Sequence, residues 1–416
     1  MNRIRVPLKI MIKLLAGMAL MAMTANASTS DAANNDHVAH GILLTTAQMD
    51  ASVRDLMKQA RVPGLAIAII QDGQIVRSQA HGMADVANHQ LMAPNTVMYA
   101  ASLTKPAFAY MTMQLVDEGI IDLDAPLPKL LKKPLPDYPD YVDLAGDPRW
   151  KAITPRMLLS HSSGLLNWRR FNDDGKLDIK YAPGTRYVYS GEGMQLLQLI
   201  DEERTGKSLT ELMQTRVFDR LGMQRTSMIW RADFAGSASN GYNTDGVSVG
   251  HEQHTKPMAA ASMDTTVEDY ARFVAAVMRG DGLSKKSARE MMRAQIRIVS
   301  PQEFPSHFPG KTRVNDAIKL SAGLGWVLYE SPLGPAMFKE GNDEGTNNFV
   351  LAFPESQMAV VMLSNSARAD RMFYPLVEAL YGRTCLPWFW MGYIPYDKSE
   401  LRNPKAREHP IAACPH

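Results

Sequence analysis

Two spacings of apolar residues alternate along the chain and predict a protein with both helices and strands. Residues 43–60 carry apolar positions at helical spacing. The apolar, β-branched run 64–70 follows, then the pair Asp72-Gly73, then a second strand-like run over 75–80. An Asp-Gly pair between two such runs is a strong hairpin signal, so we expect a helix and then a β-hairpin.

The middle of the chain has mostly helical patterns. Phe108, Met111, Thr112 and Leu115 fall at i, i+3, i+4 and i+7 of one helix. Further helices are expected to start at Thr154-Pro155, over 194–203, over 210–218, and over 270–278 after Thr266-x-x-Asp269, which is typical of a capping box. The proline-rich stretch 122–147 is expected to be an irregular covering segment.

Strand patterns return near the C-terminus, at 324–329, 336–341, 348–353 and 358–365, and a closing helix is expected over 373–381. Strands therefore cluster at both ends of the chain and helices lie between them. This order predicts an α/β (α+β) fold, with an antiparallel sheet built from both chain ends, flanked by helices, and a mostly helical second lobe inserted.

The first residues are typical of a secretory signal. Arg3, Arg5, Lys9 and Lys13 precede an apolar stretch of about eleven residues over 14–24, and Ala25-Asn26-Ala27 is a small-x-small cleavage site. We expect a cleaved signal peptide over 1–27, a polar linker over 28–42, and a bacterial periplasmic or secreted protein. The alternative is an uncleaved membrane anchor.

The charge balance bears on possible partners, and the cysteine content bears on possible disulfide bonds. Without the four N-terminal basic residues, the 45 Lys and Arg fall to 41 against 43 Asp and Glu, so no electrostatic feature favours nucleic acid as a partner. Cys385 and Cys414, the only cysteines, could pair in an oxidising compartment or remain independent thiols.

The residues after 384 form a separate aromatic-rich tail over 385–416, behind a main domain expected over 43–384. Trp388, Phe389, Trp390, Tyr393 and Tyr396 fall within nine residues. We expect a strap that packs on the body, and the alternative is contact with a membrane surface or a partner.

The candidate chemistry begins at Ser102 and Lys105. Three positions apart on a helix, their side chains share one face and can meet. If Ser102 opens the helix, the unpaired N–H groups of the first turn favour the negative charge of an attacking oxygen. A lysine normally titrates near about 10.4, so Lys105 can act as a base only if burial and a neighbouring cation lower its pKa.

Two downstream residues can complete such a site. Tyr189 lies just before a predicted helix and could pass a proton to or from Ser102. Lys339 lies at the end of a predicted strand and could supply the second cation, and Gly341 after it would let substrate approach the backbone. In isolation Tyr189 is better interpreted as a half-buried structural tyrosine, and the alternative for Lys339 is a lysine that protects an edge strand from aggregation.

Taken together in order, these stretches make the chain resemble the serine β-lactamase and penicillin-binding-protein fold family, in its class C, D-aminopeptidase and family-VIII esterase branch. The similarity covers about 63–365 and rests on Val62-Pro63-Gly64, Ala101-Ser102-Leu103-Thr104-Lys105-Pro106, Leu115 to Asp124, Thr154-Pro155 through Leu165, Pro183-Gly184-Thr185 before Tyr189-Ser190, Leu221-Gly222-Met223 and Lys339-x-Gly341.

The resemblance implies the β-lactamase/transpeptidase-like fold and a role for each site residue. Ser102 would be the acylated nucleophile, Lys105 the general base and Tyr189 the proton shuttle, with Lys339 in the cleft. The backbone N–H groups of Ser102 and Asn342 would form the oxyanion hole, beside Gly341. The reaction implied is hydrolysis of an ester or amide through an acyl-enzyme, on a small-molecule or peptide substrate. No metal or organic cofactor is implied.

Two departures from the family pattern bear on the substrate. The chain has Tyr189-Ser190-Gly191 where the family often has Tyr-x-Asn, so the amide that holds a substrate carbonyl is missing. It has Lys339-Glu340-Gly341 where the family has Lys-Thr-Gly, and a carboxylate there could repel the carboxylate of a β-lactam. We therefore expect weak or no true β-lactamase activity.

Competing interpretations of these motifs are less favoured. Gly246-Val247-Ser248-Val249-Gly250 matches a nucleophile elbow, but its surroundings predict a hairpin. His251 and His254 are spaced three apart, where the zinc-protease pattern needs four. His161 beside Ser160 and Ser162 is expected to be structural. Two alternative functions remain. One is a non-catalytic penicillin-binding or sensor module of the same fold, and the other is a structural cell-wall protein.

Overall fold

The computed structural model describes residues 43–402. The predicted signal peptide over 1–27, the linker over 28–42, and Cys414 lie outside the described residues. Cys385 is disulfide-bonded.

One antiparallel sheet organises the described part of the chain. Its nine strands lie in the order β3-β2-β1-β13-β12-β11-β10-β9-β8. The N-terminal strands are therefore joined to the C-terminal ones through β1 and β13, which pair from Leu65–Ser364 to Ile70–Ala359. The bounds are β1 Gly64–Gln71, β2 Gln74–Asp85, β3 Gln90–Leu91, β8 Ile296–Arg297, β9 Ser321–Ala322, β10 Val327–Ser331, β11 Gly334–Asp343, β12 Thr346–Phe353 and β13 Met358–Ser364.

The central strands bury both of their faces. Along β1, Ala66, Ala68 and Ile70 point into one core, whereas Leu65 and Ile67 point into a second core on the opposite face. This explains why the run 64–70 is apolar throughout rather than alternating. The predicted sheet from both chain ends is confirmed.

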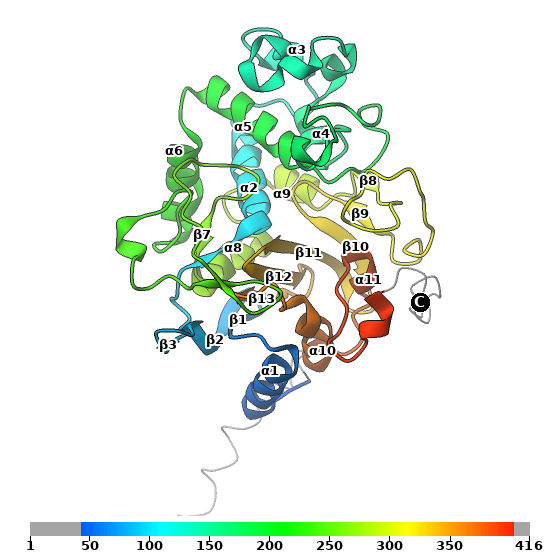
Figure 1. The fold of residues 1–416 in the computed structure, drawn as a ribbon. Helices are drawn as coiled ribbons and strands as arrows, with labels where there is room; N and C mark the ends of the chain where they lie inside the picture. The colour runs from blue at the N-terminus through cyan, green and yellow to red at the C-terminus, as the bar shows by residue number, and fades with distance from the viewer. Residues whose placement is uncertain (1–42, 403–416) are drawn as a thin grey trace, which may run out of the picture.

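Helices cover both faces of the sheet (Figure 1). On one face lie α1 (Thr46–Ala60) and α10 (Asp370–Tyr381), whose apolar side chains join the strand residues of the second core. On the other lie α2 (Thr104–Asp117) and α8 (Val267–Arg279). The N-cap Thr266 accepts a hydrogen bond from the backbone N–H of Asp269, at 3.2 Å, as the sequence predicts.

The inserted segment between the two groups of strands is mostly helical, and its helices α3, α4, α5 and α6 form the upper part of the view in Figure 1. It contains short helices and irregular turns that pack through the same core as α2. Its helices are α3 Leu127–Leu130, α4 Pro155–Leu159, α5 Gly191–Thr205, α6 Leu209–Met213, α7 Asp219–Leu221 and α9 Lys285–Met291, and its small strand pairs are β4 Met98–Tyr99 with β7 Asp264–Thr265, and β5 Gly241–Tyr242 with β6 Ser248–Gly250.

Some predicted boundaries are wrong. Ser102 does not begin an α-helix, because a 3₁₀ turn over Ala101–Leu103 precedes α2. The strand expected at 324–329 begins only at Val327, after the tight approach of Gly325 to the side chain of Ala109. The helix expected over 210–218 changes at Gln214 into a π-helical turn that continues to Phe218.

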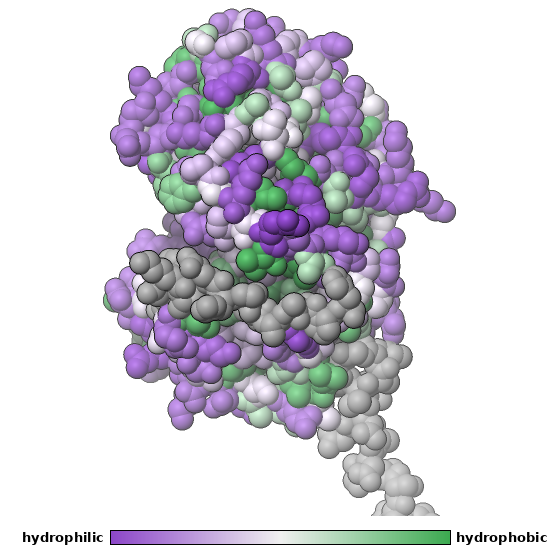
Figure 2. Space-filling model, turned by 90° about the vertical axis from the view of Figure 1, so that its right-hand side faces the viewer, coloured by the Kyte–Doolittle hydropathy of each residue, from purple (hydrophilic) through white to green (hydrophobic). Residues whose placement is uncertain are grey.

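The described part of the tail, residues 385–402, packs on the body. Trp388, Trp390 and Tyr393 are buried in the same core as α10, and the Trp388 ring lies 5.2 Å from that of Phe349 on β12. The short helix α11 (Trp388–Met391) carries the first two. Hydrophilic side chains cover most of the face seen in Figure 2, and hydrophobic ones gather there in small patches.

The burial of the tail gives a stability prediction. Trp388→Ala removes a buried indole and should lower the free energy of unfolding by about 3–5 kcal/mol. Phe389→Ala, at the half-buried neighbouring position, should cost clearly less. Urea unfolding followed by circular dichroism measures both. Equal, small losses for the two variants would show that the tail contributes little to the fold.

Candidate active site

Ser102 lies in the 3₁₀ turn between β4 and α2, at a strained and firmly held piece of backbone. Ala101, just before it, has a positive φ of 47°, which costs a residue with a side chain about 1–2 kcal/mol. The Tyr270 hydroxyl from α8 donates to the Leu103 carbonyl at 2.9 Å. The turn therefore presents Ser102, which is half-buried, in one fixed position.

Lys105 follows one turn later and its amine reaches the serine. Nζ lies 2.8 Å from Oγ of Ser102 and donates to the Ala260 carbonyl at 2.7 Å. The residue is only 1% exposed. Burial lowers the pKa of Lys105 well below its usual value, and the positive charge of Lys339 lowers it further. The arrangement favours an uncharged amine beside the hydroxyl.

Tyr189 lies directly before α5 and close to both lysines. The Nζ atoms of Lys105 and Lys339 each lie 4.9 Å from the centre of its ring. Burial raises the pKa of Tyr189 to about 12, against the opposing effects of Lys339 and of a side-chain hydrogen bond with Ser102. The phenol therefore keeps its proton at neutral pH and can donate it.

Lys339, Gly341 and Asn342 come from β11, near its open edge. β10 pairs with β11 only as far as Val327–Phe338, so the backbone from Lys339 onward is paired through β12 alone. A Cβ at Gly341 would lie 2.4 Å from the Ala100 carbonyl oxygen, so glycine lets β11 pack against the Ser102 turn.

Asn342 is exposed and its side chain is held by the tail. The Tyr393 hydroxyl lies 3.0 Å from Oδ1 of Asn342 and 2.9 Å from Oδ1 of Asn347, the residue opposite it on β12. The structure thus brings Ser102, Lys105, Tyr189, Lys339 and Gly341 to one place, with Asn342 at its rim.

Two carboxyl groups surround Lys339, and one of them was missed by the sequence analysis. Lys339 donates to the Glu340 carbonyl at 3.0 Å and forms an ion pair with the Glu340 carboxylate. Oε1 of Glu303 lies 3.9 Å from Nζ of Lys339. Glu303 comes from the irregular segment 298–314, and its only signal in the sequence was that it is the one acidic residue of this proline-containing segment.

Tyr189 is supported by the same segment, through Ser306, and by the ring of His161. The backbone N–H of Tyr189 donates to Oγ of Ser306 at 2.7 Å. The backbone N–H of Ser190 donates to Nδ1 of His161 at 3.2 Å, and the ring centres of His161 and Tyr189 are 4.7 Å apart. Burial and the two lysines hold the pKa of His161 well below its usual value, so it is a neutral structural support.

Steric crowding explains why position 191 is a glycine in this structure. A Cβ there would lie 2.8 Å from the Asn167 carbonyl oxygen and 3.0 Å from the Trp168 ring. The backbone N–H of Gly191 donates to Oδ1 of Asn167 at 2.9 Å. The space that an asparagine would need is already occupied by the neighbouring segment.

The competing motifs lie elsewhere. Ser248 is exposed on β6 of the small hairpin, as predicted. His251 bonds Asp264 at 3.0 Å and the Ser239 carbonyl at 2.9 Å. Within residues 43–402, no group of three or more His, Cys, Asp or Glu side chains is arranged to hold a metal ion. No helix among these residues is long and apolar enough to cross a membrane.

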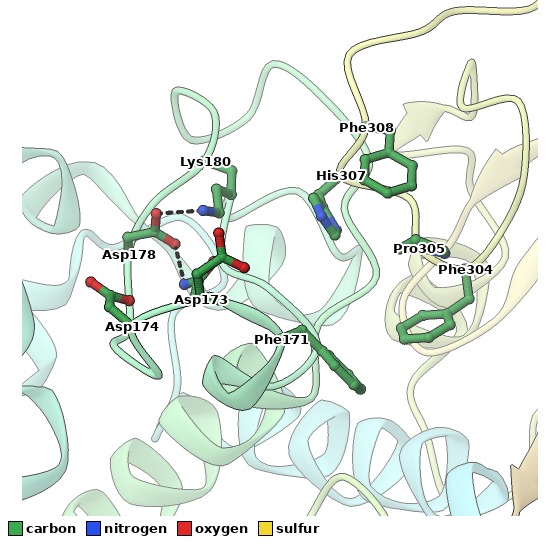
Figure 3. A pocket seen from close by; sticks show the side chains of 10 residues that line it. Phe171, Asp173, Asp174, Asp178, Lys180, Phe304, Pro305, His307 and Phe308 are labelled. Carbon is green, nitrogen blue, oxygen red and sulfur yellow. Dashed lines mark hydrogen bonds and ion pairs between the residues drawn. The ribbon is translucent and has the colours of Figure 1, made fainter.

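A pocket of about 710 Å³ opens on the outer side of the segment that carries Glu303 and Ser306. Phe304, Pro305, His307 and Phe308 line it from this segment, opposite Phe171 and the acidic turn after it (Figure 3). The ring centres of Phe171 and Phe304 are 5.3 Å apart, so the two rings meet edge to face at the pocket wall. Lys180 and Asp178, which complete the polar wall, form an ion pair at 2.7 Å.

Comparison with known proteins agrees with this geometry. The beta-lactamase family profile matches residues 49–380. The chain is 28% identical over 190 residues to a D-aminopeptidase of Gluconobacter oxydans, covering 43% of this chain and 35% of that protein. It is 27% identical over 204 residues to Esterase EstB of Burkholderia gladioli, covering 43% and 50%. The chain thus spans a third to a half of the length of these relatives.

The fold also matches solved structures. The octameric penicillin-binding protein homologue from Pyrococcus abyssi superposes with a TM-score of 0.66 at 22% identity, covering 81% of this chain and 78% of that one. Because the family profile covers most of the chain and the fold agrees with it, this protein belongs to the beta-lactamase family of serine hydrolases.

Proposed function

We propose that the protein is a secreted serine hydrolase that cleaves an ester or amide through an acyl-enzyme on Ser102. The observation that carries this proposal is the buried amine of Lys105, 2.8 Å from Oγ of Ser102, with its pKa lowered. Relatives named as a D-aminopeptidase and an esterase support this reaction class.

The proposed reaction gives each group of the site a defined role. Neutral Lys105 accepts the Ser102 proton as Oγ attacks the carbonyl carbon. The backbone N–H groups of Ser102 and Asn342 stabilise the tetrahedral oxyanion. Tyr189 donates its proton to the leaving oxygen or nitrogen and recovers one from Lys105. Water then attacks the acyl carbon and gives up a proton to neutral Lys105, which passes it to the Ser102 oxygen as that oxygen leaves.

The pocket beside Phe304 suits the part of the substrate that is remote from the scissile bond. Phe171, Phe304 and Phe308 are 44%, 49% and 53% exposed and gather around this one pocket, so a ligand there would cover apolar surface. An aromatic or long aliphatic acyl group would bury them.

The proposed location outside the cytoplasm rests on the N-terminal signal pattern. The disulfide at Cys385 supports an oxidising compartment. The three buried tail aromatics support a structural role for the tail, in place of the membrane contact considered above.

The nucleophile has a direct test. Ser102→Ala should lower ester hydrolysis by roughly a thousandfold or more and abolish fluorophosphonate labelling located by mass spectrometry. Ser248→Ala, which alters the exposed serine of the Gly-x-Ser-x-Gly stretch, should keep full activity. Full hydrolysis by Ser102→Ala of every ester, D-amino amide and β-lactam that the protein turns over would refute the proposal.

The same labelling experiment separates the alternatives. A stable adduct on Ser102 that never hydrolyses would favour the non-catalytic sensor module. An absence of labelling and of turnover across the panel would favour a structural protein.

The pH dependence follows from the charges around Lys105. Hydrolysis should rise with pH as Lys105 loses its proton. The negative charge that Glu340 and Glu303 carry raises the pKa of Lys105, so removing it while Lys339 stays protonated should lower that pKa and move this rising limb to lower pH. The variant carries both Glu303→Gln and Glu340→Gln. After a single substitution, the remaining carboxylate could still supply a negative charge beside Lys339. The measurement is kcat/KM against pH for a neutral ester.

Glu344→Gln, on the exposed turn after β11, is the matched control and should leave the limb in place. A limb that moves to higher pH in the double variant would contradict the assignment of Lys105 as the base.

The pocket makes its own prediction. Phe304→Ala should raise KM roughly tenfold or more for a phenylbutyrate ester and leave KM for an acetate ester nearly unchanged. Val314→Ala, at an exposed position of the same segment outside the pocket, is the control. A uniform change for both esters would show that the pocket does not bind the acyl group.

A further inference from the structure

The ammonium group of Lys339 is occupied by the protein's own carboxyl groups. Lys339, Glu340 and Glu303 are 1%, 4% and 5% exposed. Nζ bonds both the carbonyl and the carboxylate of Glu340, and Oε1 of Glu303 lies 3.9 Å away. A lysine that is to receive a negatively charged substrate group needs its charge free, and here the charge is already balanced.

The protonation states of the three groups leave no net positive charge. Burial opposes the charged form of Lys339, but Glu340, Tyr189 and Glu303 outweigh it and raise the pKa, so the ammonium persists. Lys339 holds the pKa of Glu340 low against the effect of burial. Burial and the neighbouring Glu340 raise the pKa of Glu303. The cluster is therefore neutral with Glu303 protonated, and negative with Glu303 ionised.

Glu303 is fixed in place by the tail. Its backbone N–H donates to the Trp390 carbonyl at 2.9 Å, and the Trp390 indole N–H donates to the Ser300 carbonyl at 3.1 Å. Three residues on, Ser306 accepts from the Tyr189 backbone. Glu303 is thus built into the wall of the site.

A substrate carboxylate that approached Lys339 would meet carboxyl groups in place of a free ammonium. Among the described residues, Oε2 of Glu340 and Oε1 of Glu303 are buried with no hydrogen-bond donor. Lys339, which they flank, lies 4.9 Å from the Tyr189 ring, beside the reacting groups. A carboxylate near the scissile bond would therefore gain no net attraction from Lys339 and would be repelled by the negative charge that balances it, whereas an uncharged group would not.

We propose that Glu340, together with Glu303, neutralises the positive charge of Lys339. The site then selects acyl substrates that have no carboxylate beside the scissile bond. The substrate class is neutral esters and amides, and β-lactams and peptides that end in a free carboxylate are rejected by charge. This inference rests on the proposed Ser102 acyl-enzyme.

The test compares two substrates that differ in one charge. Nitrocefin carries a free carboxylate, and nitrocefin methyl ester does not. The wild-type full chain should favour the methyl ester in kcat/KM. Glu340→Gln, which removes the charge and keeps the shape, should raise the ratio of nitrocefin to methyl ester by roughly tenfold, and the double variant with Glu303→Gln should raise it further. Glu344→Gln should leave the ratio unchanged.

The outcomes separate the two proposals. A wild-type enzyme that neither turns over p-nitrophenyl butyrate nor labels at Ser102 ends the proposed function. A double variant that keeps p-nitrophenyl butyrate activity with an unchanged substrate ratio overturns the charge-selection proposal alone. Loss of p-nitrophenyl butyrate activity in both single variants also overturns it, since the acids would then serve catalysis.

A second measurement needs no variant, in case the double substitution fails to fold. Phenylboronic acid and 3-carboxyphenylboronic acid both add to an active-site serine and differ in one carboxylate. The neutral compound should inhibit ester hydrolysis by the wild type at least about tenfold more tightly. Equal or tighter inhibition by the carboxylated compound would overturn the proposal.

Discussion

The active site depends on the burial of the Lys105 amine, which is unfavourable for a charged group. A lysine side chain 1% exposed and 2.8 Å from a serine hydroxyl has lost the water that normally stabilises its charge. In exchange it has a hydrogen bond to the Ala260 carbonyl and a second lysine nearby that disfavours protonation further. Burial disfavours the charged form of the amine, and the proposed role as a base requires the uncharged form. Burial and the proposed chemistry therefore both favour neutral Lys105.

The two lysines are held in opposite states by their surroundings. Lys105 has the side chain of Ser102 and a backbone carbonyl as close partners, whereas Lys339 has the carboxylate of Glu340. Pairs of titratable groups with divergent pKa values are typical of acid–base sites. The centre of the Tyr189 ring lies 4.9 Å from Nζ of each lysine, and the phenol keeps its own proton, which suits the proposed transfer of a proton to the leaving group.

The C-terminal tail is part of the site's framework. Trp390 accepts from the backbone of Glu303, and Tyr393 bridges Asn342 and Asn347 at the end of β11. Segments far apart along the chain therefore fix the acids and the edge strand together. The position of Glu303 depends on the tail as much as on its own loop.

The sequence by itself determined the hairpin at Asp72-Gly73, the sheet drawn from both chain ends, and the residue types at Ser102, Lys105, Tyr189 and Lys339, because periodicity and turn chemistry are local properties. It could not place Glu303 or the pocket beside Phe304, since the segment 298–314 has no periodicity and takes its shape from contacts with Trp390 and Tyr189. Tertiary structure alone decided that Glu340 balances Lys339 and that Asn167 fills the space beside Gly191. These outcomes depend on which distant side chains share a buried volume, and charge and steric fit within that volume are not written in the order of the residues.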